Sequence, residues 1–496
     1  MHIVELPDDV LLHIALELSI EDILSFKQTC RVLHAFGTTD YLWHRLAVRS
    51  GLLLNIPTDT AIATLSADEL QRVVIDAMRL EANWTRADPK IKRTTSLYNA
   101  NNALFEHLQF VEGGKWLLVV QDRFHRFEER AYTKVSFWSL HNIDEPHCVV
   151  QFELTGKCRA SDVALQNENE TVTFVVALTD GQGDFFEIRT FSLNSEYATL
   201  SQIAPFPSIS RRIDLPASPT PDLPLNMSIT SLSVSGKILA ATVTVFNVDH
   251  HEASRILVTR TDQGPAYWMQ KQPYKPIHPA LTRLHKNHIV IFGHSAEGFA
   301  CHTYELPPIL LRNYTPFTAS FSSYSPADAL AWGPLVADNT CANDKFENLF
   351  PEPRTVPPIS NDTLAFIAVQ GSRANLVRFH LDVQSPTAMG SAKSRAHPLP
   401  VVLPPDTSIR LVGVGGSGRR AVWMEHNFET TRSQLMRLEV LHDDPKRSQV
   451  MYKVLLPPDP PLPFSTDACQ ALAFNESSCR LCFGLWDGSL HLVDFL

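Results

Sequence analysis

The sequence predicts an α+β multidomain chain: an N-terminal all-α unit of three helices, a linker helix, and an all-β propeller of about seven blades. Three observations favour this class. Residues 1–47 carry apolar residues at helical spacing, residues 48–103 contain one further amphipathic helix, and residues 104–496 carry short apolar runs separated by turn residues. We therefore place domain boundaries after residues 47 and 103.

The bulk composition narrows the class of protein. The chain is 44% hydrophobic and 19% charged, with a formal net charge of −10, which argues against a surface for nucleic acid or anionic membrane. No apolar run approaches ~18 residues, so no transmembrane helix is expected. The eight cysteines form no tight framework and no secretory signal precedes them. We expect a cytoplasmic or nuclear protein, or one found in both, with free thiols.

The N-terminal unit begins at Leu6-Pro7-Asp8-Asp9, where Pro suits a first helical turn and the two acids complement the positive helix end. Apolar residues then recur at helical spacing: Val10, Leu11, Ile14, Ala15 and Leu18. Leu12 and Leu16 lie off this stripe, so a second apolar face needs covering. A unit this small buries little surface by itself, which favours a partner-binding module over a helical cap docked on the rest of the chain.

A set of residues in this unit follows a known order and spacing: Leu6-Pro7, Asp9, Val10-Leu11, Ile14-Ala15, Leu18, Asp22-Ile23, Cys30-Arg31 and Leu42-Trp43-His44-Arg45-Leu46. On these residues the segment resembles an F-box. Ala15 is small where the family usually has Leu, and Leu33 stands where an aromatic residue is frequent. If Ala15 lies at the partner contact, its small side chain should soften that contact.

The resemblance implies binding to the Skp adaptor of a Skp–cullin–F-box (SCF) ubiquitin ligase. It carries the adaptor contact to Leu6, Pro7, Leu11, Ile14, Leu18, Ile23 and Leu24, with Val32, Leu42 and Trp43 as further contacts or internal core. It also implies that the rest of the chain recruits an unknown protein substrate, and that the chain itself is a receptor without catalytic residues, cofactor or metal.

The linker contains a helix with a clear start. Ser66 and Glu69 form a capping-box pattern, and apolar residues follow at helical spacing as far as Trp84. The helix is interpreted either as a surface helix stabilised by its own stripe or as a stiff spacer between adaptor and substrate parts.

A strand–turn–strand unit recurs in the long C-terminal part. Four clear copies cover 108–120, 232–241, 411–423 and 471–483, and weaker copies cover 162–176, 284–292 and 364–379. Third strands follow at 135–140, 185–193 and 376–381, and the chain ends on 486–495. The long, irregular period fits a propeller with long Pro-rich loops, weakly similar to WD repeats through Trp486-Asp487. No strand is assigned between about Pro307 and Ser360.

Several motifs suggest sharper chemistry. Gly413–Gly418 could bind phosphate, but a strand follows it, so a hairpin turn is favoured. Cys479 and Cys482 could form half a zinc site, although residues three apart on a strand face opposite sides, and buried free cysteines are favoured. His250-His251, His285 and His288 lack a supporting cluster. Arg211-Arg212 and Arg419-Arg420 could bind an acidic or phosphorylated segment, or be solvated turn charges.

The main hypothesis is therefore a substrate receptor of an SCF ubiquitin ligase, in which the F-box binds the Skp adaptor and the propeller recruits a target for ubiquitin-dependent degradation. A second hypothesis is a scaffold whose F-box acts in protein–protein interaction outside a ligase. A third is a propeller hydrolase with a helical cap, which needs a carboxylate or His cluster at the central channel.

Overall fold

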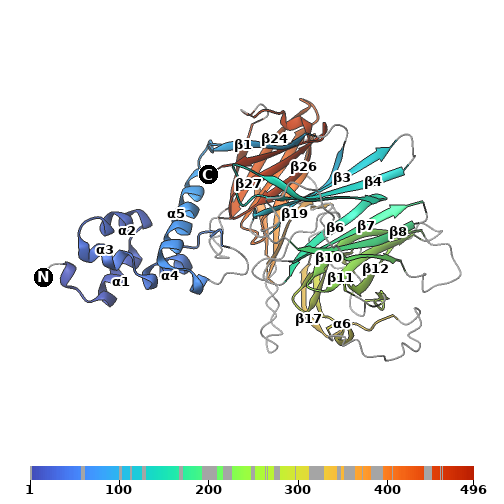
Figure 1. Cartoon of the computed structure of the whole chain (residues 1–496), viewed down its shortest axis with the longest axis horizontal. Helices are drawn as coiled ribbons and strands as arrows, with labels where there is room; N and C mark the ends of the chain where they lie inside the picture. The colour runs from blue at the N-terminus through green and yellow to red at the C-terminus, as the bar shows by residue number, and fades with distance from the viewer. Residues whose placement is uncertain are drawn as a thin grey trace.

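The computed structural model describes residues 3–495 with gaps at 57–61, 100–102, 112–113, 126–129, 167–170, 182, 193–208, 216–225, 247–251, 263, 265, 273–276, 278–279, 296–297, 312–328, 343–347, 351–362, 371–372, 381–394, 405, 441–449, 458–459 and 461. A small helical unit lies at one side, the strands lie at the other, and a single long helix stands between them (Figure 1).

The helical unit has four α-helices in its described residues, rather than the three expected. After η1 (Ile3–Glu5) come α1 (Asp8–Glu17), α2 (Ile20–Lys27), α3 (Arg31–Gly37) and α4 (Asp40–Arg49). The break between α3 and α4 comes from two threonines. The hydroxyls of Thr38 and Thr39 donate to the carbonyls of Ala35 and Phe36, at 2.9 and 2.8 Å, in place of continued helical bonds.

The linker helix begins as its sequence predicts. A short turn, η2 (Ile62–Thr64), precedes α5 (Ala67–Trp84), and both halves of the Ser66–Glu69 capping box are formed.

The strands form seven four-stranded antiparallel sheets over the described residues. The first four are β2–β5 (Leu104–Val111, Trp116–His125, Arg130–Ser139, His147–Thr155), β6–β9 (Lys157–Gln166, Thr171–Asp180, Gly183–Ser192, Ile209–Asp214), β10–β13 (Asn226–Ser235, Ile238–Phe246, Glu252–Arg260, Tyr267–Trp268) and β14–β17 (Ala280–His285, His288–Ser295, Gly298–Glu305, Leu335–Ala342). Two more are β18–β21 (Asn348–Phe350, Thr363–Gln370, Arg373–His380, Arg395–Val402) and β22–β25 (Thr407–Val414, Arg420–Asn427, Arg432–Val440, Val450–Leu456).

The last sheet joins the two ends of the strand region. It combines β26 (Cys469–Asn475), β27 (Arg480–Leu485) and β28 (Ser489–Asp494) with β1 (Arg93–Asn99). The remaining short elements are α6 (Pro308–Leu311) and η5 (Thr466–Ala468). First strands of successive sheets contact one another, as in β6 with β10, β10 with β14, and β22 with β26, and β26 also contacts β2. This radial arrangement is a β-propeller, so the expected fold class is confirmed.

The sequence copies correspond to strands of these sheets. The four clear copies, and those at 162–176 and 284–292, cover the first two strands of their sheets, whereas 364–379 covers the second and third, β19 and β20. The stretch without assigned strands contains α6, β17 and β18 in its described part. Pro398 lies on β21, the outermost strand of its sheet, where a missing backbone donor is tolerated.

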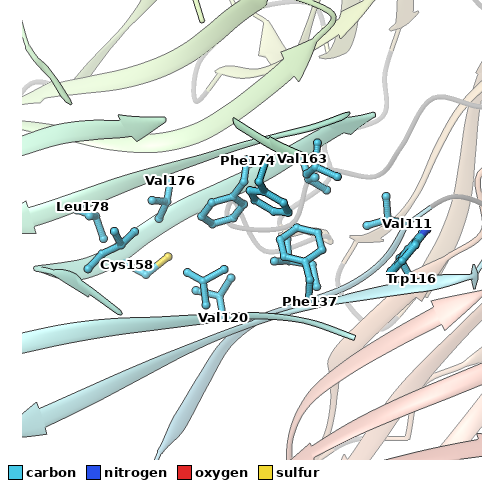
Figure 2. Packing of buried hydrophobic residues seen from close by; sticks show 14 of the residues in the cluster. Val111, Trp116, Val120, Phe137, Cys158, Val163, Phe174, Val176 and Leu178 are labelled. Atoms are coloured by element: carbon cyan, nitrogen blue, oxygen red, sulfur yellow. The ribbon is translucent and has the colours of Figure 1, made fainter. Parts of the chain in front are cut away.

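Neighbouring sheets pack face to face through apolar side chains. Between the first two sheets, Val120 and Phe137 face Phe174 and Val176 across the interface (Figure 2). Phe137 contacts Phe174 edge-on, with ring centroids 6.3 Å apart. Further apolar clusters of this kind lie between other blades, and serine hydroxyls of β10 accept backbone N–H groups of β14.

A buried ion pair links three consecutive blades. The Arg283 guanidinium on β14 lies 3.0 Å from the Asp162 carboxylate on β6, and the same carboxylate oxygen accepts the Val234 backbone N–H of β10 at 2.8 Å. Removing one partner would leave the other charge buried without compensation.

The propeller starts earlier than the predicted boundary at residue 104. Strand β1 pairs with β28 from Arg93↔Asp494 to Asn99↔Ser489, so part of the predicted helical linker is the outer strand of the last blade. The sequence signal was weak because Arg93–Asn99 is mostly polar, and none of the side chains from 93 to 97 is fully buried.

A truncation tests this closure. A chain that starts at residue 104 should be less stable than one that starts at residue 88, because only the second retains β1. We expect a difference of about 3 kcal/mol or more in the free energy of unfolding, from the lost ladder hydrogen bonds. Urea unfolding of both chains measures it, and equal stabilities would contradict the closing role of β1.

A buried carboxyl predicts a pH effect on stability. Asp122 on β3 accepts bonds from the Thr133 hydroxyl and the Cys158 backbone N–H, at 3.0 and 3.2 Å. Burial, with Glu106 nearby, raises its pKa to about 7 from 3.8. The unfolded chain therefore loses this proton at lower pH than the folded protein does.

Because the folded protein keeps this proton to a higher pH than the unfolded chain, the free energy of unfolding should fall as the pH rises from about 4 to about 7. The group contributes at most ~1.4 kcal/mol per pH unit. Asp122→Asn keeps an acceptor but cannot ionise, and should flatten that part of the slope. Urea unfolding at a series of pH values measures both chains, and parallel slopes would refute the assignment.

Candidate protein-binding site

One face of α1 lies outside the core of the helical unit. Val10 is 39% exposed, Pro7 is exposed and Ile14 is half-buried, and none of the three belongs to the apolar cluster of the unit. Their spacing places them on one side of the helix. Leu11 and Ala15, on the other side, are 2% and 1% exposed and pack in the core. The unit therefore presents an apolar face that its own fold does not cover.

The structure separates the ten predicted adaptor-contact residues into two groups. Six are accessible, at least in part: Leu6, Pro7, Ile14, Leu18, Leu24 and Val32. Four lie in the core of the unit: Leu11, Ile23, Leu42 and Trp43. Leu11 and Ile23 were expected at the contact, but side chains this deeply buried hold the helices together and cannot reach a partner.

Trp43 and Ala15 both stabilise the fold of the helical unit rather than a contact with a partner. The Trp43 indole N–H donates to the Gly37 carbonyl at 2.9 Å, which fixes α4 against the end of α3. Ala15 was expected to soften a partner contact. It lies instead where α1 packs in the core, so its small side chain sets the internal packing of the unit.

Helix α5 joins the helical unit to the propeller. Its first half packs with Leu70 and Val74 in the core of the helical unit. The Asp40 carboxylate accepts the Ala67 backbone N–H at 2.6 Å, and the Lys27 ammonium donates to the Gln71 side chain at 2.6 Å. The same continuous helix then reaches the last two blades.

The second half of α5 is embedded in the propeller through Trp84. Its side chain is fully buried and stacks on Phe474, with ring centroids 5.8 Å apart. The Arg420 and Arg437 guanidiniums lie over the same ring at 5.5 and 5.7 Å. Leu80 joins this apolar cluster one turn earlier.

Around Trp84 lies a group of charges that we call the α5 clasp: Glu81, Arg419, Arg420, Arg437 and Glu439. The Glu81 carboxylate on α5 pairs with Arg419 at 2.7 Å and with Arg420 through its other oxygen. Arg420 also pairs with Glu439 at 3.0 Å. Arg437 donates to the backbone carbonyls of Trp84 and Arg86 at the end of the helix.

Burial governs the protonation of the clasp. Burial raises the pKa of Glu439 to about 7, against the attraction of Arg420. It lowers the pKa of Arg437 to about 10. Burial would also lower the pKa of Arg420, but the neighbouring Cys479, Glu439 and Glu81 raise it by more. Arg420 therefore remains charged and holds both carboxylates.

The glycine-rich segment is a hairpin turn between β22 and β23, as favoured from the sequence. Its backbone N–H groups bind an anion that belongs to the chain. The Glu476 carboxylate accepts from the Ser417 and Arg420 backbone N–H groups, each at 2.8 Å, and a Cβ on Gly415 would clash with it at 2.1 Å. The Glu476 carboxylate therefore occupies the position at which the sequence allowed a bound phosphate.

The cysteine and histidine motifs form no site in the described residues. Cys479 and Cys482 are free, fully buried thiols that belong to different apolar clusters. His285 and His288 flank the turn between β14 and β15, and His250-His251 lies outside the described residues. Among the described residues, no group of three or more His, Cys, Asp or Glu could hold a metal ion.

Three of the four paired arginines bind groups of the fold, and the fourth, Arg212, is exposed. Arg419 and Arg420 belong to the clasp, and Arg420 is only 1% exposed. Arg211 donates to the Arg260 carbonyl at 2.8 Å, while Arg212 lies 3.7 Å above the Phe185 ring and 3.4 Å from Asp180. The solvated-charge interpretation holds for Arg212, whose side chain is exposed, but not for buried Arg420. Sequence alone cannot show a partner 338 residues away, as Glu81 is from Arg419.

The fold and this site define a protein with an F-box-like helical domain mounted on a β-propeller, an architecture typical of non-catalytic adaptor proteins. Residues 3–49 match the F-box-like family. No curated protein matches the chain. None of the described helices is long and apolar enough to cross a membrane.

The solved structures that the chain matches include the three below, all at low identity. The β-propeller domain of Cps50 (Swd1) from Myceliophteria thermophila is 8% identical, with a TM-score of 0.42, over 80% of this chain and 98% of that one. The Dos1 propeller is 8% identical, with a TM-score of 0.40, over 82% and 95%. The acylaminoacyl peptidase of Pyrococcus horikoshii is 9% identical, with a TM-score of 0.41, over 79% and 51%.

The clasp yields a stability prediction. Arg420→Ala should remove the counter-charge nearest to Glu439 and leave Glu81 and Glu439 to share Arg419, at 2.7 and 3.6 Å. We expect a cost of about 3 kcal/mol in the free energy of unfolding. Arg79→Ala is the control, because its pairing with Asp76 at 3.9 Å is exposed and worth less than ~1 kcal/mol. Urea unfolding compares the variants. Equal losses from both would show that the clasp contributes no more than a surface pair.

Proposed function

We propose that the protein is a substrate receptor of an SCF ubiquitin ligase, which acts in the cytoplasm, the nucleus or both. In this proposal the helical unit binds a Skp-type adaptor, and the propeller recruits a protein for ubiquitination and degradation. The observation that carries it is the uncovered apolar face of α1 in a domain that matches the F-box-like family. The chain would contribute positioning rather than catalytic groups.

The proposed adaptor contact is the accessible set alone. Pro7 and Val32 are its exposed members, and Ile14, Leu6, Leu18 and Leu24 contribute their exposed parts. Burying such a patch against a partner supplies the hydrophobic free energy that the isolated unit leaves unused. The four core residues act indirectly, because they hold α1 in place.

The α5 clasp favours a receptor in which the helical unit is held rigidly on the propeller over one in which it is loosely tethered. A ligase transfers ubiquitin efficiently when the adaptor and the target are held at a fixed distance. Helix α5 is part of two cores, so a partner on the helical unit would keep a defined orientation toward the propeller.

Ile14→Asp tests the proposal. It places a charge on the uncovered face, and should weaken co-purification with recombinant Skp adaptor at least about tenfold, since ~2 kcal/mol of apolar contact is lost. Leu11→Asp would be uninformative because it buries a carboxylate in the core. Val48→Asp is the matched control, an exposed valine on α4.

Wild-type chain that fails to bind the adaptor, or equal binding by the Ile14 and Val48 variants, would refute the adaptor contact. Addition of the cullin–RING module, ubiquitin and its activating enzymes to the wild-type complex tests the ligase role. Assembly with the adaptor but no ubiquitin transfer to the complex would favour a scaffold outside a ligase.

A further inference from the structure

Two aromatic side chains are exposed at the end of the propeller away from α5. Trp486 is 60% exposed and Phe428 is 53% exposed. Phe428 follows β23 and Trp486 follows β27, and both of these strands begin at the α5 end, at Arg420 and Arg480. A strand of this length spans about 20–25 Å. The two aromatics therefore lie on the face opposite the mount of the helical unit.

The two aromatics belong to one surface, which we call the aromatic face: Phe428, Trp486 and the turn η5 between them. The Trp486 backbone N–H donates to the Ala468 carbonyl of η5 at 3.0 Å. The Asp467 carboxylate of η5 accepts the Ser433 backbone N–H at 2.6 Å, just after the Phe428 turn. These bonds hold both turns against the same short element.

Charges around the aromatic face select the chemistry of a partner. Four exposed carboxylates lie on or next to its turns, Asp406, Glu429, Asp467 and Asp487, against the two exposed guanidiniums of Arg410 and Arg432. The hydroxyl and backbone N–H of Ser489 hydrogen-bond the Asp487 carboxylate and lower its pKa, so it is anionic at neutral pH. The local balance is negative, which matches a cationic partner.

The chain already shows how this surface binds a cation. The Arg410 guanidinium lies over the Phe428 ring at 5.7 Å, and the His426 ring meets the same ring edge-on at 5.1 Å. Trp486 has no corresponding cation among the described residues, although an indole is the best side chain for such a contact. Trp486 is followed in the same turn by Asp487, which is also exposed, and an exposed indole with a carboxylate in one turn is complementary to a Lys or Arg side chain.

We propose that the aromatic face docks a basic segment of the protein that the propeller recruits, with a Lys or Arg side chain stacked on Trp486 and paired with Asp487. This inference rests on the proposed function for the identity of the occupant as a recruited protein. It differs from an acidic or phosphorylated segment, because three of the four arginines suggested for such a segment, Arg211, Arg419 and Arg420, bind groups of the fold.

The experiment uses the full chain and two fluorescent peptides, one of alternating lysine and glycine and one of alternating glutamate and glycine, at physiological salt. The lysine peptide should bind, and Trp486→Ala should weaken it about tenfold through loss of the cation–π contact. Asp487→Asn should weaken it in the same direction. Val454→Ala is the control, an exposed valine on β25, the outer strand of the blade that carries Phe428.

Equal binding of the lysine peptide by wild type and both Trp486 and Asp487 variants would overturn the proposal, as would tighter binding of the glutamate peptide. Circular dichroism confirms that each variant is folded. Adaptor binding is measured on the same preparations. If the wild-type chain does not bind the adaptor but binds the lysine peptide in a Trp486-dependent way, only the proposed function is refuted. If it binds the adaptor but its peptide binding does not depend on Trp486, only the docking face is refuted.

Discussion

The arrangement of the two domains depends on one buried ion-pair group, in which Arg420 holds the Glu81 and Glu439 carboxylates around the end of α5. Buried ion pairs add little net stability, because desolvation of the charges offsets their attraction. Their geometry is nevertheless restrictive, since a charge that leaves its partner remains buried and uncompensated. The clasp therefore acts mainly on orientation, by allowing one angle between α5 and the propeller.

The helix itself extends this constraint to the helical unit. An 18-residue α-helix is about 27 Å long, and α5 is anchored at both ends by buried apolar side chains, Leu70 at one end and Trp84 at the other. The capping box at Ser66 and the Arg437 bonds to the last carbonyls satisfy its terminal backbone groups. The two interpretations of this helix, a helix stabilised by its apolar stripe and a stiff spacer, are therefore compatible, because the apolar stripe anchors both of its ends.

Much of the fold could be predicted from the sequence because it rests on local patterns. Repeated apolar strands identified the propeller, and the spacing of Leu6-Pro7 to Leu46 identified the F-box-like domain. The polar strand β1 was missed because its pairing with β28 joins residues about 400 positions apart. Helical periodicity assigned Leu11 and Ile14 to one stripe, yet only packing decides that Leu11 faces inward and Ile14 outward.

The pairing of β1 with β28 can form only after β28 has been translated, so it fixes the order of folding. The segment that leaves the helical domain is the one that closes the ring, and its partner β28 is translated much later. During translation the helical domain can fold early, with its apolar α1 face already formed, while Trp84 and Glu81 still lack the blades that hold them. The contacts between β1 and β28 join residues far apart in the sequence, and such contacts make ring closure slow. Until β28 is paired, the helical domain of the nascent chain has no fixed orientation relative to the propeller.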